Sequence, residues 1–244
     1  MRVVTTAHKA GLDQYAHRWF DSRKNWPKKT EFWFYAEGYD LDAKGVTVKD
    51  VLDVPGFAEW KAKHIHYVPP AWQWDVVRFA HKVFAVCDAL MDYDGIGVWL
   101  DADVVTHKKL PAGKIEEAVA GHYIAHYGRT GFYTETGMWI VDCSHPEHRA
   151  FMETLRQSYL NERYQLLPQW HDCMVFDATL RAFVKAGRIT AKNLSGAFHK
   201  DMHPMAKTEF AKYLDHLKGG RKSYGVSPEN KWHMESMAAV REGS

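Results

Sequence analysis

The chain has 244 residues, with 32 Lys and Arg against 30 Asp and Glu, so its formal net charge is +2 with His counted as neutral. Hydrophobic residues make up 46% and charged residues 25%, which is typical of a globular protein and excludes a disordered chain, a collagen and a coiled coil. The near balance of charge argues against a protein that coats nucleic acid with a broadly basic surface.

The cysteines and the apolar stretches bear on the cellular compartment. Cys87, Cys143 and Cys173 lie far apart and form no C-x-x-C pair, so we expect buried thiols in a reducing compartment. The N-terminus lacks the apolar core of a signal peptide, and the longest apolar stretches fall well short of the roughly 20 residues that a membrane span needs. The sequence therefore predicts a cytoplasmic protein without a membrane span.

The first half of the chain alternates between predicted strands and helices. A β-rich run at Arg2–Ala7 precedes a helix over 12–24, and strands follow at Glu31–Ala36 and at 65–68. The periodicity then predicts one long helix that Asp75 caps and that ends near Met91. The next run, Ile96–Leu100, is apolar throughout, as a buried central strand should be. This alternation predicts a Rossmann-like α/β fold.

The second half is less regular. From Pro204 the chain has the composition of a polar, basic tail, with a helix near 208–217. No internal repeat or low-complexity linker interrupts the chain, so we expect one domain with a C-terminal extension. Before Pro204, the second half has predicted strands at 121–127 and 137–141 and predicted helices at 147–159 and 172–185.

The most specific local signal is the end of the predicted central strand. Asp101 and Asp103 follow it, two positions apart, so on an extended segment both carboxylates point the same way. In open α/β sheets, ligands bind at the carboxyl ends of the strands. Two carboxylates there suit Mg²⁺ or Mn²⁺, which can in turn hold a diphosphate. The alternative is a solvated acidic turn.

A second signal lies in the C-terminal extension, where His216, Gly219 and Lys222 follow one another at intervals of three. This spacing can supply a metal ligand, a close backbone approach and a cation for phosphate. A basic helix end with a glycine cap is the other interpretation. His199 and His203 stay open as alternatives to His216.

Together these residues resemble the GT-A glycosyltransferases, and most closely the retaining glycosyltransferase family 8 of the glycogenin and galactosyltransferase type. The Leu-Asp-Ala-Asp-Val-Val run from Leu100 to Val105 and the His-x-x-Gly-x-x-Lys run match two motifs of that family. The tail Tyr-Leu-Asp-His-Leu-Lys-Gly-Gly-Arg-Lys is similar to small phage-encoded glycosyltransferases. The resemblance implies an α/β GT-A fold, a Rossmann-like mixed sheet flanked by helices, with a basic C-terminal extension.

The resemblance also implies roles for residues and segments. Asp101, Asp103 and His216 would bind Mn²⁺ or Mg²⁺, and Gly219 and Lys222 would contact the diphosphate of a nucleotide sugar, which we expect to be a UDP-sugar. Within one catalytic domain, 1–105 would bind the nucleotide, 106–203 would face the acceptor, and 204–244 would close over the donor. The other residues expected along the donor are Thr5, Ala7, Arg78, Lys82 and Ala102.

Two further stretches match the family with departures. Residues 135–142 resemble its strand Asn-Ala-Gly-Val-Met-Leu-Ile-Asn, with Thr136 in place of the Asn. Trp170-His171-Asp172 stands where the family has a polar pair under the anomeric carbon, and His171 can replace the missing Gln. By resemblance the sugar is transferred to an acceptor hydroxyl with retention. An inverting reaction would need a carboxylate base, for which Asp172 and Glu135 are the candidates.

The acceptor is less defined. Trp72, Trp74, Tyr127, Phe132 and Tyr133 fall in predicted loops near the site, and aromatic rings stack on sugars and on nucleobases alike; core packing is the alternative. The phage-like tail allows a hydroxymethylated pyrimidine of DNA as the acceptor, flipped out of the duplex between the basic stretches 18–29 and 207–222. A saccharide is the other expected acceptor, and a lipid or protein acceptor also stays open.

Two other functions fit the same residues. Nucleotidyl transfer uses a similar metal held by aspartates on a similar sheet, and it would release pyrophosphate. A nucleotide-sugar-binding module could keep the fold without turnover. If the protein is phage-encoded, its compartment is the host cytoplasm.

Overall fold

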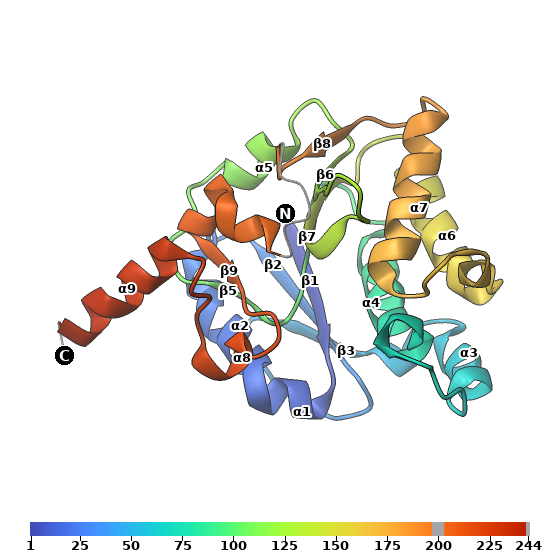
Figure 1. The fold of residues 1–244 in the computed structure, drawn as a ribbon, viewed down its shortest axis with the longest axis horizontal. Coiled ribbons are helices and arrows are strands. Elements are labelled where there is room, and N and C mark those ends of the chain that lie inside the picture. The colour runs from blue at the N-terminus through green and yellow to red at the C-terminus, as the bar shows by residue number, and fades with distance from the viewer. Residues whose placement is uncertain (197–202, 243–244) are drawn as a thin grey trace.

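The computed structural model describes residues 1–196 and 203–242, and its centre is a seven-stranded mixed sheet (Figure 1). Its strands are β1 (Arg2–Ala7), β2 (Glu31–Ala36), β3 (Thr47–Asp50), β4 (Ile96–Leu100), β6 (Ile124–Tyr127), β7 (Glu135–Asp142) and β8 (Ala191–Asn193), in the order β3-β2-β1-β4-β7-β6-β8. The first four strands are parallel, β7 is antiparallel to both its neighbours, and β8 is parallel to β6. The carboxyl ends of β1, β2 and β4 therefore meet at one edge.

Helices cover both faces of this sheet (Figure 1). One core, with Phe84, Trp139 and Phe151, joins the sheet to α3 (Phe57–His64), α4 (Val76–Leu90), α6 (His148–Leu160) and α7 (Asp172–Lys185). The other core, with Trp19 and Phe34, involves α2 (His17–Ser22), α5 (Lys114–Val119) and a ribbon of β5 (Val104–Thr106) and β9 (Leu214–His216). The short α1 (Lys9–Gly11) and α8 (Arg221–Tyr224) lie near the sheet edge, and α9 (Lys231–Glu242) projects from the body (Figure 1).

The long helix before β4 is the element that aims side chains at the edge. Asp75 caps it, with its carboxylate accepting a hydrogen bond from Arg78 N at 3.2 Å. Its buried stripe covers β1, and its N-terminal half brings Arg78 and Lys82 to the carboxyl end of the sheet. The predicted helix from Asp75 to near Met91 is confirmed.

Two other expectations for the first half needed correction, and one strand was missed. The strand predicted at 65–68 is wrong. Helix α3 ends at His64, and Ile65 and Val68 are 52% and 85% exposed, so this apolar run is not a buried strand of the sheet. The missed strand β3 is a polar edge strand with half-exposed side chains. The helix expected over 12–24 exists but contains a π-helical turn at Leu12–Ala16.

The helix expected near 208–217 is also wrong. The chain instead forms a 3₁₀ turn at Glu209–Lys212 and then β9, which pairs antiparallel with β5. Local periodicity misses this strand because its partner lies far away in the sequence. No helix in the part of the chain that the structure describes is long and apolar enough to cross a membrane.

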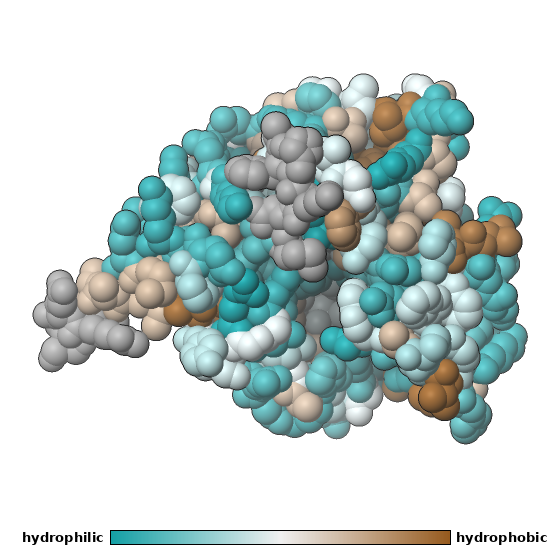
Figure 2. Space-filling view, viewed as in Figure 1, coloured by the Kyte–Doolittle hydropathy of each residue, from teal (hydrophilic) through white to brown (hydrophobic). Residues whose placement is uncertain are grey.

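The surface view of the same face is mostly hydrophilic, with apolar side chains in small separate groups (Figure 2). Cys87, Cys143 and Cys173 are all free thiols, and the first two are buried. Because the described residues show no large apolar patch on this face (Figure 2), the candidate site is sought among the polar groups at the sheet edge.

Candidate active site

The carboxyl edge of the sheet carries the two aspartates that follow β4. The sequence predicts an extended segment here. The chain instead makes a tight turn, closed by a 2.8 Å hydrogen bond from Val104 N to Asp101 O. This turn redirects the chain into β5, which leaves the sheet. It still brings the carboxylates together: oxygens of Asp101 and Asp103 lie within 4.8 Å of each other and of a His216 nitrogen.

His216 reaches this turn because β9 pairs with β5. Val104 and His216 are register partners, and Leu217 N donates to Asp103 O at 2.9 Å. The imidazole Nε2 lies 3.1 Å from Asp103 Oδ1 and 3.8 Å from Asp101 Oδ2. Two acidic oxygens and one imidazole nitrogen thus converge from two distant segments.

Gly137 of β7 leaves the space that His216 fills. A Cβ at this position would lie 2.2 Å from Cε1 and 2.4 Å from Nδ1 of His216, far inside van der Waals contact. Beside it, Glu135 Oε1 accepts a hydrogen bond from Gly137 N at 3.1 Å and lies 3.9 Å from His216 Nδ1. A glycine is therefore required beneath the imidazole.

The alternative histidines are placed differently. His203 is buried, and its Nε2 lies 3.1 Å from Ser227 Oγ and 3.7 Å from Asp215 Oδ1. It does not belong to the group formed by Asp101, Asp103 and His216. His199 lies outside the described residues.

Asp103 is held as a carboxylate by two neighbouring groups. Burial disfavours its charged form, but His216 and the ammonium of Lys222, 3.0 Å from Oδ2, hold the pKa of the carboxyl well below its usual value. Gly219, with φ +57°, turns the chain after His216 so that α8 returns Lys222 to this position. Glycine tolerates this left-handed conformation without strain.

Lys82 links the aspartates to α7. Its Nζ lies 2.8 Å from Asp101 Oδ1 and 2.8 Å from Asp172 Oδ2, and it donates to Thr136 O at 2.6 Å. Burial would lower the pKa of this amine, but Asp101 and Asp172 outweigh burial and raise it. Lys82 is therefore a buried, charged bridge between the two acids.

The two candidate bases are both held by cations. Burial opposes the charge of Asp172, yet Lys82 and a 2.5 Å hydrogen bond from Thr136 Oγ1 lower the pKa of its carboxyl. The carboxyl of Glu135 likewise has a lowered pKa despite burial, because Lys218 forms an ion pair with it and Arg129 lies 3.6 Å away. Each carboxylate is thus an anchor in an ion-pair cluster.

A cavity of about 180 Å³ lies beside this cluster at the carboxyl ends of β1, β2 and β4. Thr5 is buried beneath the edge, and its neighbour Thr6 faces the cavity instead. Gly219 lies at an exposed turn and does not line the cavity. The expected donor residues that do line it are Ala7, Arg78, Lys82, Asp101, Ala102, Asp103 and Lys222, together with Asp172.

Sequence reasoning missed several residues of this cavity, among them Glu37, Tyr15 and His8. Glu37 follows β2 directly, and burial raises the pKa of its carboxyl to about 7. Tyr15 packs under Lys222, whose Nζ lies 4.1 Å from the ring centroid, and His8 lies after β1. The position of Glu37, one residue beyond a correctly predicted parallel strand, was a signal that could have found it.

His171 caps the N-terminus of α7. Its Nδ1 accepts a hydrogen bond from Met174 N at 3.3 Å, and its Nε2 lies 2.9 Å from Gln169 Oε1. Burial lowers the pKa of this imidazole. A neutral ring with Nε2–H donating to Gln169 satisfies both contacts. His171, Asp172 and Cys173 also form a group of possible metal ligands.

The aromatic residues expected near the acceptor separate into two kinds. Tyr127 is fully buried in the core. Trp72 is 54% exposed, and its ring centroid lies 5.6 Å from that of His171. Tyr133 lies 4.4 Å from His171 on the other side, with Phe132 beside it. Trp72, Phe132 and Tyr133 thus lie where α7 meets the cavity.

The basic stretches do not flank the site together. Lys24, Lys28 and Lys29 are exposed near the start of β2, where Glu31 pairs with Arg2. This is the opposite end of β1 from Ala7, roughly 17 Å away at about 3.3 Å per residue. From that stretch, Arg18 is the residue that contacts the C-terminal extension, through Lys222 O at 2.7 Å.

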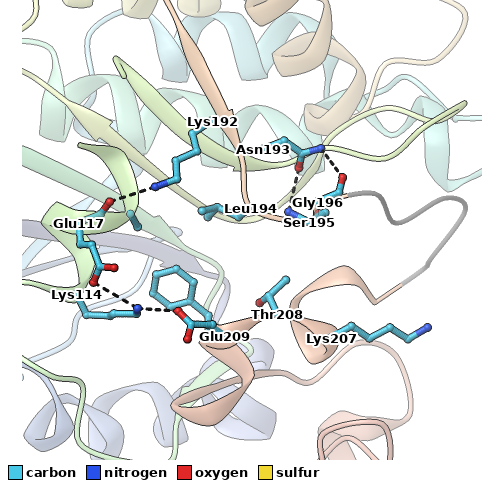
Figure 3. A pocket seen from close by; sticks show the side chains of 12 residues that line it. Lys114, Glu117, Lys192, Asn193, Leu194, Ser195, Gly196, Lys207, Thr208 and Glu209 are labelled. Atoms are coloured by element: carbon cyan, nitrogen blue, oxygen red, sulfur yellow. Dashed lines mark hydrogen bonds and ion pairs between the residues drawn. The ribbon is translucent and has the colours of Figure 1, made fainter. Parts of the chain in front are cut away.

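A second cavity, of about 280 Å³, lies between α5, β8 and the 3₁₀ turns after residue 203 (Figure 3). Its charged groups contact one another: Lys114 Nζ lies 2.8 Å from Glu209 Oε2, and Lys192 Nζ donates to Glu117 O at 3.2 Å. Asp101 and Asp103 line the cavity at the sheet edge, and His216 lies against them. That cavity is therefore the stronger candidate.

The architecture is that of the GT-A glycosyltransferases: a mixed seven-stranded sheet, mostly parallel in its first half, flanked by helices. The fold class expected from the sequence is confirmed. No family model and no curated protein matches the sequence, so the likeness to known proteins is structural.

Two solved structures illustrate this likeness. The galactosyltransferase LgtC, solved in complex with donor and acceptor sugar analogues, superposes with a TM-score of 0.55 and 10% sequence identity, over 98% of this chain and 96% of LgtC. Mouse xyloside xylosyltransferase 1 superposes with a TM-score of 0.50 and 9% identity, over 79% of this chain and 84% of that one. At these identities the comparison establishes the fold.

Proposed function

We propose that the chain is a metal-dependent glycosyltransferase that moves a sugar from a UDP-sugar to an acceptor hydroxyl with retention, as in glycosyltransferase family 8. The observation that carries the proposal is the convergence of Asp101, Asp103 and His216 beside a cavity at the carboxyl edge of a GT-A sheet. In open α/β folds this edge is where nucleotides bind. Residues 1–105 supply most of the cavity, and 204–244 supply His216 and Lys222.

The donor set fits a divalent cation. Two carboxylate oxygens and one imidazole nitrogen lie within 4.8 Å of one another, and carboxylates with imidazole suit Mn²⁺ while carboxylates also suit Mg²⁺. Asp101, Asp103 and His216 would hold the ion, with Glu135 behind the imidazole to orient it. Bound there, the ion would stabilise the negative charge that a diphosphate gains as it leaves.

The cations of the chain complete the donor site. Lys222 contacts Asp103 at 3.0 Å and lines the cavity, so its ammonium can reach a phosphate oxygen by a small rotation. Arg78 lines the same cavity and is exposed. Lys82 is already bound to Asp101 and Asp172, so its role is to fix those carboxylates in place.

The ion pairs also support retention over inversion. An inverting reaction needs a carboxylate free to take the proton of the acceptor hydroxyl. Asp172 is bonded to Lys82 and Thr136, and Glu135 to Lys218, with Arg129 near. The pKa of each carboxyl is lowered by these cations, so both are weaker proton acceptors than a carboxylate without a cation beside it.

The test is release of UDP from a panel of UDP-sugars by the full chain, with Mn²⁺ and with excess EDTA. Asp103→Asn should lower release at least about 100-fold and abolish metal-dependent UDP binding, while far-ultraviolet circular dichroism stays unchanged. Full activity in that variant or in EDTA would contradict the proposal. Pyrophosphate as the product would indicate nucleotidyl transfer, and NMR of the product anomer tests retention.

A further inference from the structure

An exposed tryptophan, Trp72, lies next to residues of the donor cavity, and ring contacts and backbone hydrogen bonds hold it in place. Trp72 is 54% exposed, yet its ring lies 5.6 Å from His171 at an interplanar angle of 37° and 6.2 Å from Phe79. Asp75 N donates to Trp72 O at 3.2 Å, and Trp170 N donates to Gln73 O at 2.9 Å, so the turn is tied to the segment before α7. The indole thus packs against two rings while about half of the residue stays exposed, which leaves ring surface open to a ligand.

The residues behind Trp72 connect it to the cavity. Phe79 lines the cavity and lies 5.9 Å from His171. His171 is held by its cap to Met174 N and by Gln169, and Tyr133 packs against it from the side, 4.4 Å away. Asp172, the next residue, lines the cavity itself. The open face of Trp72 is therefore preorganised next to the place where the donor would react.

The charges around the site favour a neutral ligand over a nucleic acid. Lys212, Lys218, Arg221 and Lys222 of the basic stretch 207–222 are each within ion-pair distance of an acid, namely Glu209, Glu135, Glu229 and Asp103. The exposed lysines of 18–29 lie at the far end of the sheet. A duplex at this stretch would therefore meet four cations that are already paired with acids, whereas DNA binding depends on cations that are free to contact phosphates.

We infer that Trp72 is the stacking platform of an acceptor subsite for a neutral saccharide, with His171 as its positioning residue. The apolar face of a pyranose ring would lie on the open side of the indole, as sugars do on tryptophan, and its hydroxyls would face the cavity. This inference rests on the proposed glycosyl transfer, but its binding component can be tested without turnover.

The binding test uses the full chain labelled with 5-fluorotryptophan. Of its ten tryptophan signals, the one absent in Trp72→Phe reports on the platform. Maltose, lactose and cellobiose are titrated in turn, each with UDP and Mn²⁺ present. At least one should shift the Trp72 signal, and Trp72→Ala should weaken that sugar's binding about 10-fold or more, whereas Trp72→Phe should keep it within about 3-fold. Leu166→Ala, at an 86% exposed apolar residue on another turn, is the matched control.

A second measurement separates this inference from the proposed function. Transfer to the bound sugar should show a raised KM in Trp72→Ala, whereas Leu166→Ala should leave both this KM and the hydrolysis of UDP-sugar by water unchanged. Saccharide binding without any UDP release would refute glycosyl transfer and leave the platform standing. UDP release in the wild type with no shift of the Trp72 signal by any of the three sugars would refute the platform. Glycosylation of a duplex carrying 5-hydroxymethylcytosine, unaffected by Trp72→Ala, would refute it too.

Discussion

The substitution Gly137→Ala tests how the candidate metal site is assembled. The added methyl group would lie 2.2 Å from Cε1 and 2.4 Å from Nδ1 of His216. The separation between this methyl group and the imidazole must therefore grow by about 1 Å or more, through movement of β7 or of the imidazole. β7 cannot move easily, because Gly137 O accepts from Asp101 N and the next residue, Met138, pairs with Leu100. We therefore expect the imidazole to be displaced from Asp101 and Asp103.

The magnitude follows from overpacking in a buried site. Gly137→Ala should lower the free energy of unfolding by about 1–3 kcal/mol; at about 2–4 °C per kcal/mol, a 2 kcal/mol loss lowers Tm by about 4–8 °C. Removal of the imidazole by His216→Ala also removes the clash. In that background the same glycine substitution should cost no more than about 0.5 kcal/mol.

The assay is a double-mutant cycle. Thermal unfolding in EDTA gives the four stabilities, and calorimetric titration with Mn²⁺ gives the metal affinity, which should fall about 10–100-fold in Gly137→Ala. Gly220→Ala is the matched control, because φ is −60° there and no atom lies within 4 Å of the added Cβ. Equal costs of Gly137→Ala in the two backgrounds, or wild-type Mn²⁺ affinity in the single variant, would refute the assigned role of His216.

Three further predictions test the charges around the cavity. His216→Ala should weaken Mn²⁺ binding at least about 10-fold more than His203→Ala, and titration calorimetry showing the reverse order would move the third ligand to His203. Lys82→Met leaves the buried Asp172 and the half-buried Asp101 without their cation and should cost about 3–5 kcal/mol in denaturant unfolding; an unchanged midpoint would contradict the role of Lys82 as their bridge. Glu37→Gln should stabilise the fold at pH 8 by up to about 3 kcal/mol, with the gap closing towards pH 4.5. The sign follows because burial raises the pKa of Glu37 to about 7, so the folded wild type holds this proton longer and loses stability as pH rises from about 4.5 to 7. Thr6, Asp50, Lys61, Arg78 and His81 face this carboxyl. His81, whose lowered pKa of about 4 reflects burial and Lys61, costs stability below pH 6.5 in both chains, so the slope above pH 6.5 is the part that reports on Glu37. A pH-independent difference between the two unfolding curves would contradict this origin.

The first half of the fold could be predicted because its signals are local. β1, β2 and β4 are apolar runs buried on both faces, and α4 carries a helical stripe with a side-chain cap. The carboxyl edge of such strands identifies the site region without a structure. The same reasoning would reach Glu37, since it follows β2 as directly as Asp101 follows β4.

The aromatic and ion-pair contacts could not be predicted in this way. Trp72, Phe79, Tyr133 and His171 come from four segments, and their proximity depends on how α4 and α7 pack across the sheet edge. Lys82 was expected to face the donor from its place on α4, but the ion pairs that hold it depend on Asp172 of α7. Packing between distant elements decides both, and local sequence patterns do not reveal it.

The C-terminal extension shows why polarity alone misleads. Its sequence has the composition of a solvated tail, yet Asp215, Ser227 and Asn230 are fully buried. Asp215 Oδ2 accepts hydrogen bonds from Ser227 N at 2.7 Å and His233 Nδ1 at 2.8 Å, and Asn230 Nδ2 donates to Leu214 O at 2.9 Å. A three-residue strand such as β9 is too short to hold itself on β5, and this buried network supplies the missing restraint. These buried polar residues therefore hold β9, and with it His216, in position. The same polar composition that suggests a solvated tail thus stabilises the strand.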